Sequence, residues 1–274
     1  MKKYNVQNEI IIYDFLKENV NLSKNSIKNL LHDKYIYVND KSVTKFDYLL
    51  KKDDIVEIKS TNNIDIIYED KDIIVVNKPS GLLTISNAKE KNKTLYKMVS
   101  DYVKRNVKNK KIFIIHRLDK DTSGIVLFAK SQKIKELYQN NWNDIVRERK
   151  YIAVIQGKMN NKKGTITSYL TENKDHIVYS SKNGKLAITD YIVLKEGNDK
   201  SLIDINIKTG RKNQIRVHMK ENNTPILGDS KYGKKIKDRM YLHAHKLKLV
   251  NPKTNNTMTF ETDIPDKFKK ILKN

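Results

Sequence analysis

The sequence contains no cysteine among its 274 residues. This absence excludes disulfide bonds, thiolate metal sites and every mechanism that needs a cysteine nucleophile. Long apolar runs are also missing, because no stretch approaches the 18 apolar residues typical of a membrane span, and the N-terminus leads into no apolar signal segment. We therefore expect a cytoplasmic protein that does not bind a membrane.

Acidic residues are few relative to basic ones. There are 32 Asp and Glu against 55 Lys and Arg, which gives a formal charge of +23 and a pI near 9.7. Such an excess favours a polyanionic partner, nucleic acid before membrane, although a lysine-rich habit of the source organism is an alternative. Residues 1–60 carry only +2, so most of the charge lies in the rest of the chain.

Arginine is scarce, since only seven of the 55 basic residues are Arg. An arginine in this chain is therefore expected where a planar, bidentate donor is required. Three of the seven, Arg117, Arg211 and Arg216, fall in two short motifs.

Motifs for common cofactors are absent as well. No segment matches the glycine-rich phosphate loops G-x-x-x-x-G-K-[ST] or G-x-G-x-x-G. His243 and His245 alternate on a predicted strand without a carboxylate or cysteine at ligand spacing. We expect neither a cofactor nor a metal.

The first 60 residues predict a small α/β domain. Apolar residues recur at helical spacing over residues 10–20, and a second helix follows Ser23 as its N-cap. Residues 59–63 read as a polar linker, which divides the chain into domains at residues 1–62 and 63–274. Short strands separated by polar turns are predicted at residues 35–38, 48–50 and 53–58.

The second domain is dominated by strand-like apolar blocks. Neither a fixed-period repeat nor a regular βαβ alternation is present. The pattern predicts an α+β fold, with a mixed, mainly antiparallel sheet and flanking helices. The predicted strands lie at residues 73–76, 112–115, 125–129, 151–155 and 202–207, and the predicted helices at residues 133–146 and 214–220.

Asp119 lies in a polar loop, residues 116–124, between two of these strands. The loop displays its carboxylate between rigid supports, where a reactive group is expected. An aspartate in such a turn more often accepts backbone N–H bonds than performs catalysis, so the spacing alone leaves both interpretations open. Asp121 adds a second carboxylate, and a glycoside-hydrolysing pair is a further alternative that the basic composition does not favour.

The loop sequence HRLDKDTSG at residues 116–124 resembles the central motif of the RluA-type pseudouridine synthases. The resemblance covers about residues 64–260 and implies an isomerase that converts uridine to pseudouridine in structured RNA, without metal or cofactor. The flanking segments match the family's other motifs in order: VNKPSGL at 76–82, KYIA at 150–153, TGRKNQIRVH at 209–218, PILGD at 225–229, YG at 232–233 and LHA at 242–244.

Segments of the first domain, at residues 22–31, 36–41 and 50–56, resemble an S4 RNA-binding domain. Tyr35 and Asp40 depart from that family, which often has glycine at these positions. The resemblance implies RNA contacts for Lys24 and Lys28. Because S4-bearing synthases generally act on ribosomal RNA, large-subunit ribosomal RNA is the expected substrate. The alternative is a small α/β appendage that does not contact RNA.

The resemblance also implies the catalytic roles. Isomerising uridine requires a nucleophile that captures one fragment while the base rotates, and an ionised carboxylate can do this. Asp119 either adds to C6 of uracil or attacks C1′ of the ribose, and the sequence leaves this choice open. Arg216 is expected to keep the carboxylate ionised and oriented. Tyr151 is expected to stack on the base, with a proton-removing role at C5 as the alternative.

The target uridine must leave its stack to reach Asp119. His116 and Arg117 are expected to fill the vacancy and hold phosphates, although His116 could instead cap the preceding strand. The remaining expected RNA contacts are Leu118, Thr122, Lys78, Arg211 and Lys212.

Lys212 and Asn213 replace the commoner Thr/Ser–His pair of the family's third motif. We expect this departure to affect RNA contacts more than catalysis. The alternative function is a non-catalytic RNA-binding or ribosome-assembly protein on the same scaffold. In either case we expect a monomer.

Overall fold

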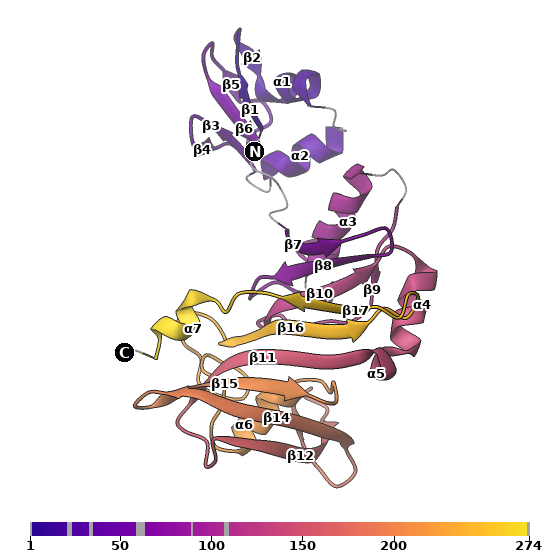
Figure 1. The fold of residues 1–274 in the computed structure, drawn as a ribbon. Coiled ribbons are helices and arrows are strands. Elements are labelled where there is room, and N and C mark those ends of the chain that lie inside the picture. The colour runs from indigo at the N-terminus through magenta and orange to yellow at the C-terminus, as the bar shows by residue number, and fades with distance from the viewer. Residues whose placement is uncertain are drawn as a thin grey trace. The chain divides into compact units, whose positions relative to one another are not determined.

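The computed structural model describes residues 2–20, 24–32, 35–58, 64–88, 90–106 and 110–272. The chain forms two compact units, Met1–Asn63 and Ile64–Asn274 (Figure 1). Ser23, the predicted N-cap, and the predicted linker at residues 59–63 lie outside the described residues. None of the helices in the described ranges is long and apolar enough to cross a membrane.

The first unit packs two helices against short antiparallel strands. Its core is formed by apolar side chains of both helices and of the strands, among them Ile12, Leu16, Ile27, Ile36 and Val56. A four-stranded sheet has the order β1 (Lys2–Asn5), β6 (Ile55–Ile58), β3 (Ile36–Val38) and β4 (Lys41–Ser42), β2 (Ile10–Ile11) pairs with β5 (Leu49–Leu50), and the helices are α1 (Ile12–Asn19) and α2 (Lys24–His32).

The turn between β3 and β4 explains one departure from the S4 pattern. Asn39 and Asp40 have φ of 47° and 64°. Both angles lie in the left-handed region, as a two-residue hairpin turn requires, and Asn and Asp are the non-glycine residues that adopt it most readily. Asp40 therefore forms the turn without glycine.

The second unit contains an 11-stranded sheet with helices packed on it (Figure 1). All pairings among the described strands are antiparallel except that of β10 with β16. The predicted α+β class, with a mixed and mainly antiparallel sheet, is thus confirmed. The order is β13 (Val178–Ser180), β12 (Lys163–Glu172), β14 (Lys185–Glu196), β15 (Lys200–Ile207), β11 (Val146–Gln156), β16 (Leu242–Val250), β10 (Ser123–Ala129), β8 (Ile73–Lys78) and β7 (Asp65–Glu69); β17 (Thr257–Glu261) pairs with β16 and β9 (Phe113–Ile114) with β10.

The helices of this unit cover both faces of the sheet. Strands β8 and β10 contribute alternate residues to two apolar clusters, one packed against α3 and the other against α4, so both strands are continuous apolar runs. Ile215 and Met219 of α6 pack on Ile203 and Ile205 of β15. The helices are α3 (Leu95–Asn106), α4 (Gln132–Asn140), α5 (Trp142–Ile145), α6 (Gln214–Glu221) and α7 (Asp266–Lys270).

The single helix predicted at residues 133–146 is wrong in its extent. The chain forms α4 and α5 with Asn141 between them, and β11 begins at Val146. Asn141 has φ −102° and ψ 10°, and its side-chain amide donates to the carbonyl of Leu137 at 2.8 Å. This side-chain hydrogen bond caps α4 and ends the helix early.

Two buried histidines predict acid sensitivity. His218 bonds to Thr189 and Ser168, and His243 to Ser123 and Thr262, at 2.7 to 3.0 Å. Each is 1% exposed, and burial lowers the pKa of His218 to about 4 and that of His243 to about 3. As the pH falls from 6.5 to 4, the unfolded chain therefore takes up protons that the folded chain does not.

The free energy of unfolding should consequently decrease by on the order of 3 kcal/mol for each of the two histidines over that range. Urea unfolding at a series of pH values measures this decrease. His218→Gln should remove about half of this decrease, because His243 still contributes, whereas His176→Gln, at an exposed position, should leave the profile unchanged. A profile of wild type that is flat between pH 6.5 and 4 would contradict the prediction.

Candidate active site

The second unit contains a cavity of about 580 Å³. It lies where the loop before β10, the strand β11 and the start of α6 meet, because residues of all three line it. Nine of the twelve side chains predicted from the sequence line this cavity: Asp119, Tyr151, Arg216, His116, Arg117, Leu118, Thr122, Arg211 and Lys212.

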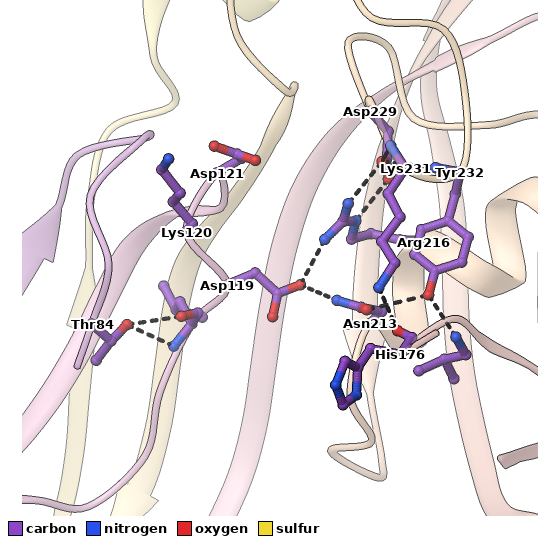
Figure 2. Close-up of polar contacts among 12 residues, drawn as sticks. Thr84, Asp119, Lys120, Asp121, His176, Asn213, Arg216, Asp229, Lys231 and Tyr232 are labelled. Atoms are coloured by element: carbon purple, nitrogen blue, oxygen red, sulfur yellow. Dashed lines mark hydrogen bonds and ion pairs between the residues drawn. The ribbon is translucent and has the colours of Figure 1, made fainter. Parts of the chain in front are cut away.

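The backbone around Asp119 is held by the segment after β8. Thr84 donates its hydroxyl to the carbonyl of Leu118 at 2.8 Å and accepts the N–H of Leu118 at 3.3 Å (Figure 2). Gly81 donates its N–H to the backbone carbonyl of Lys120 at 3.0 Å. Ser80 donates its hydroxyl to the backbone carbonyl of Asp121 at 2.6 Å. The segments that resemble the first and central motifs thus fix each other, and the Asp119 side chain projects from a rigid loop.

Gly124 is required where this loop enters β10. Its φ is +116°, and a Cβ at this position would lie 2.1 Å from the carbonyl oxygen of Ala244. Only glycine permits this approach. The pairing of β10 with β16 therefore depends on the last residue of the HRLDKDTSG motif.

Lys78 is not where a phosphate contact would be. Its side chain is fully buried, and its ammonium donates to the carbonyls of Pro79 at 3.0 Å, Leu82 at 2.7 Å and Lys120 at 2.9 Å. Burial lowers the pKa of Lys78 to about 7, against the raising effect of Asp121 and Asp119. The predicted contact with RNA phosphate does not fit this placement, because backbone carbonyls of the Asp119 loop and of the segment after β8 enclose the ammonium.

The two carboxylate oxygens of Asp119 differ in their surroundings. Oδ2 accepts a hydrogen bond from Arg216 Nη1 at 3.1 Å and another from Asn213 Nδ2 at 2.6 Å (Figure 2). Oδ1 accepts none from any residue in the described ranges. The side chain is 28% exposed, so this second oxygen is accessible from the cavity.

Arg216 is held in turn by Asp229. Its Nε and Nη2 donate to the two carboxylate oxygens of Asp229 at 2.7 and 2.8 Å, a bidentate pair. Asp229 is fully buried and also accepts the N–H groups of Lys231 and Tyr232. Burial alone would lower the pKa of Arg216, but the hydrogen bonds and charges of Asp229 and Asp119 raise it. The guanidinium therefore stays charged with Nη1 directed at Asp119.

Asn213 is the second group that orients Asp119. It precedes α6 in the left-handed conformation, with φ 52° and ψ 19°. Its side-chain oxygen accepts the hydroxyl of Tyr232 at 3.2 Å, and that hydroxyl accepts the N–H of Val178 at 2.9 Å. The expectation that the departure at Lys212–Asn213 affects mainly RNA contacts does not fit this geometry, because the Asn213 amide contacts Asp119 itself.

Replacing Asn213 should change the rate of reaction more than RNA affinity. Asn213→Ala removes a hydrogen bond to a charged group and should lower kcat by about 10- to 100-fold. Asn213→Asp puts a like charge beside Asp119, so the acid limb of the kcat profile should move to higher pH. Rates measured from pH 5 to 9 test both. An unshifted profile in the Asp variant would contradict the proposed contact.

Tyr151 is half-buried on β11 and lines the cavity. Burial raises the pKa of Tyr151 to about 12. At neutral pH its hydroxyl is therefore protonated, and the unassisted side chain is a poor base. This environment favours the stacking role over proton removal.

His116 forms part of the cavity wall. Its Nε2 accepts the N–H of Leu127 in β10 at 3.2 Å, and its ring centroid lies 5.1 Å from that of Trp142. Burial, with a smaller effect of Arg149, lowers the pKa of His116 to about 4, so the ring is neutral at pH 7. The alternative role, as a cap between strands, fits this placement. Arg117, the next residue, is exposed.

The sequence reasoning missed several residues of the site. Asp229 and Tyr232 lie in segments that match the family's later motifs, so their order along the chain carried a signal. Arg149, one of the few arginines, and Trp142, the only tryptophan, line the cavity without belonging to a quoted motif. The rarity of arginine and tryptophan in this chain is the only sequence feature that could have pointed to these two residues.

Lys24 and Lys28 belong to the first unit. Both are exposed on α2, and their ammonium groups lie 6.0 and 5.8 Å from the ring centroids of Tyr13 and Phe46. Each is thus a solvent-accessible cation beside an aromatic ring.

Comparison with known proteins identifies the family of this chain. The family model of RNA pseudouridylate synthases matches residues 72–221. The chain is 30% identical to the uncharacterized RNA pseudouridine synthase YhcT of Bacillus subtilis, over 96% of this chain and 92% of that protein. It is 34% identical to the ribosomal large subunit pseudouridine synthase D of Borreliella burgdorferi, over 88% and 77%.

A solved structure shares the fold. Human RNA Pseudouridylate Synthase Domain Containing 4 superposes with a TM-score of 0.63 at 23% identity, covering 75% of this chain and 90% of that one. This structural likeness shows the fold alone. The family model and the relatives of at least 30% identity also show the family. The chain therefore belongs to the RNA pseudouridine synthases, a family of isomerases.

Proposed function

We propose that this enzyme is an RluA-type synthase that converts uridine to pseudouridine in large-subunit ribosomal RNA, with Asp119 as the nucleophile. One observation carries the proposal: Asp119 Oδ2 is held by Arg216 and Asn213, while Oδ1 is free of hydrogen bonds within the described residues and accessible from the cavity. A carboxylate held ionised through one oxygen can attack through the other.

The reaction needs no change of redox state. Oδ1 bonds to C6 of the uracil or to C1′ of the ribose, and the N1–C1′ bond breaks. After rotation of the base, the C5–C1′ bond forms, the C5 proton is lost, N1 gains a proton, and the carboxylate is released. Arg216 holds Asp119 through Oδ2, and Tyr151 stacks on the base while its phenol stays neutral.

The cationic groups around the cavity suit RNA. Arg117, Arg211 and Lys212 line it and are exposed, and we assign them to the phosphates next to the target uridine. Lys212 also pairs with Glu172, so it would exchange that partner for a phosphate. Leu118 and Thr122 contribute to the wall against which the flipped nucleotide lies.

Residues 1–62 are assigned as an S4-like RNA-binding domain, and residues 63–274 as the catalytic domain. The exposed Lys24 and Lys28 on α2 support this assignment. A relative of this chain is named for the large ribosomal subunit, which supports ribosomal RNA as the substrate. The enzyme would act in the cytoplasm and as a monomer.

Deleting residues 1–62 should weaken binding of full-length RNA by about tenfold or more, and should slow the chemical step much less, because the lysine contacts with phosphates are lost. Lys24→Gln with Lys28→Gln should reproduce part of this loss. Lys17→Gln with Lys41→Gln removes two exposed charges elsewhere on the unit and is the matched control. Unchanged KM for the deletion variant would show that the first unit does not select RNA.

The substrate is tested by mapping pseudouridines in unmodified transcripts after incubation with the enzyme. Large-subunit ribosomal RNA should gain pseudouridine at defined positions, whereas small-subunit ribosomal RNA and transfer RNA should not. Modification of transfer RNA alone would contradict the proposed substrate, and modification of no RNA would contradict the proposed activity. Activity should fall steeply with added salt, because lysine contacts release counterions.

A further inference from the structure

A second pocket of about 260 Å³ adjoins the catalytic cavity. The two share Trp142, Arg149, Gly210 and Arg211 in their linings, and Lys208 lines only the second pocket. The lining of the second pocket contains three cationic side chains and no acidic one, and of the three Lys208 pairs with Asp190, outside the lining, at 3.3 Å. It is therefore contiguous with the active site and suited to an anion.

Arg149, which lines both pockets, has no carboxylate partner among the described residues. Its Nη2 donates to the carbonyl of Lys208 at 2.7 Å, and its side chain is half-buried. Burial lowers the pKa of Arg149, and Arg211 acts in the same direction. Arg216, by contrast, is paired with two carboxylates. A partly buried guanidinium without a counter-charge is costly, and a bound phosphate would remove that cost.

Gly210 holds the Arg149 guanidinium close to the backbone. A Cβ on Gly210 would lie 2.8 Å from Arg149 Nη1, so a larger residue would displace the guanidinium. The loop that carries Arg211 into the third motif is thus shaped around Arg149. The arginine is placed between the two pockets by the same segment that leads to Asn213 and Arg216.

Trp142 supplies an aromatic surface to the same pocket. It is the only tryptophan of the chain, it is half-buried at the start of α5, and it lines both pockets. Aromatic side chains beside cationic ones are the usual platform for an unstacked base, and such stacking contributes about 1–3 kcal/mol per base.

From this arrangement we infer that the second pocket binds the nucleotide next to the target uridine. Arg149 holds the phosphate that links the two nucleotides, Lys208 and Arg211 flank that phosphate, and the neighbouring base lies against Trp142. The inference rests on the proposed function, which puts the target uridine in the catalytic cavity. The enzyme would then bind two adjacent unstacked nucleotides.

The single tryptophan makes this testable by fluorescence. Hexauridylate should quench the emission of Trp142, because a base stacks on the indole, whereas pyrophosphate at the same concentration should not. Arg149→Gln should weaken hexauridylate binding by about tenfold, the value of one charge-assisted hydrogen-bonded contact. Arg147→Gln removes the same charge from an exposed side chain that lines neither pocket, and it should weaken binding by less than about twofold.

Lys208→Gln is a second variant that tests the same pocket if the Arg149 variant fails to fold, because Lys208 is exposed. It should also weaken binding more than Arg147→Gln does. Absence of quenching, or equal losses in the Arg147, Arg149 and Lys208 variants, would overturn the inference. Wild-type enzyme is assayed for pseudouridine formation in parallel: activity without quenching refutes only the second pocket, and quenching without activity refutes only the proposed reaction.

Discussion

Asp119→Asn is expected to lower the rate of pseudouridine formation by on the order of 10⁴-fold or more, because an amide oxygen is too weak a nucleophile to replace the carboxylate. The side chain keeps its shape and can still accept the hydrogen bond from Arg216. RNA affinity should therefore change little. Single-turnover rates with enzyme in excess, combined with filter binding of the same RNA, separate the two quantities.

Asp121→Asn is the matched control for this substitution. Asp121 lies in the same loop, but its backbone carbonyl rather than its carboxylate makes the hydrogen bond to Ser80. This variant should keep most of the activity. Equal losses in the two variants would indicate a pair of carboxylates acting together, as in glycoside hydrolysis. A fully active Asp119→Asn enzyme would show that Asp119 is not the nucleophile.

Arg216→Met is expected to damage both catalysis and folding. Loss of the guanidinium removes the charge beside Asp119, which should lower kcat by about 10²- to 10³-fold. It also leaves the fully buried Asp229 without its partner, and breaking a buried pair in this way costs about 3–5 kcal/mol. Rates and urea unfolding curves, measured on the same preparation, give the two losses.

The double variant Arg216→Met with Asp229→Asn separates these effects. The neutral amide that replaces the Asp229 carboxylate needs no counter-charge, and its oxygen can still accept the N–H groups of Lys231 and Tyr232. Stability should therefore recover in large part, while activity should stay as low as in the single variant. Recovery of activity together with stability would show that Arg216 serves the fold and does not act on Asp119.

The sequence predicted the α+β class, because apolar blocks such as those of β8 and β10 are buried on both faces and read directly as strands. It also predicted that Asp119, Tyr151 and Arg216 belong together, although they lie far apart along the chain. That prediction depended on motif order and not on physical reasoning, which favoured a structural aspartate. The cavity in which they meet could be found only from the fold.

Other features depended on contacts that the sequence does not encode locally. Lys78 looks like any basic residue of an RNA-binding protein, and only the fold reveals that three carbonyls surround its ammonium. From the sequence, Asn213 is only a substitution in a pair expected to contact RNA. The structure shows that its amide donates a hydrogen bond to Asp119. Both outcomes follow from tertiary packing around one loop, where the chemical type of a residue does not determine its partner.

The most direct test compares pseudouridine maps of RNA from cells of the source organism that carry the enzyme, lack it, or lack it and are supplied with either wild type or Asp119→Asn. Defined pseudouridines of large-subunit ribosomal RNA should disappear without the enzyme, return with wild type and not return with the Asp119 variant. Identical maps with and without the enzyme, or restoration by Asp119→Asn, would contradict the proposed function.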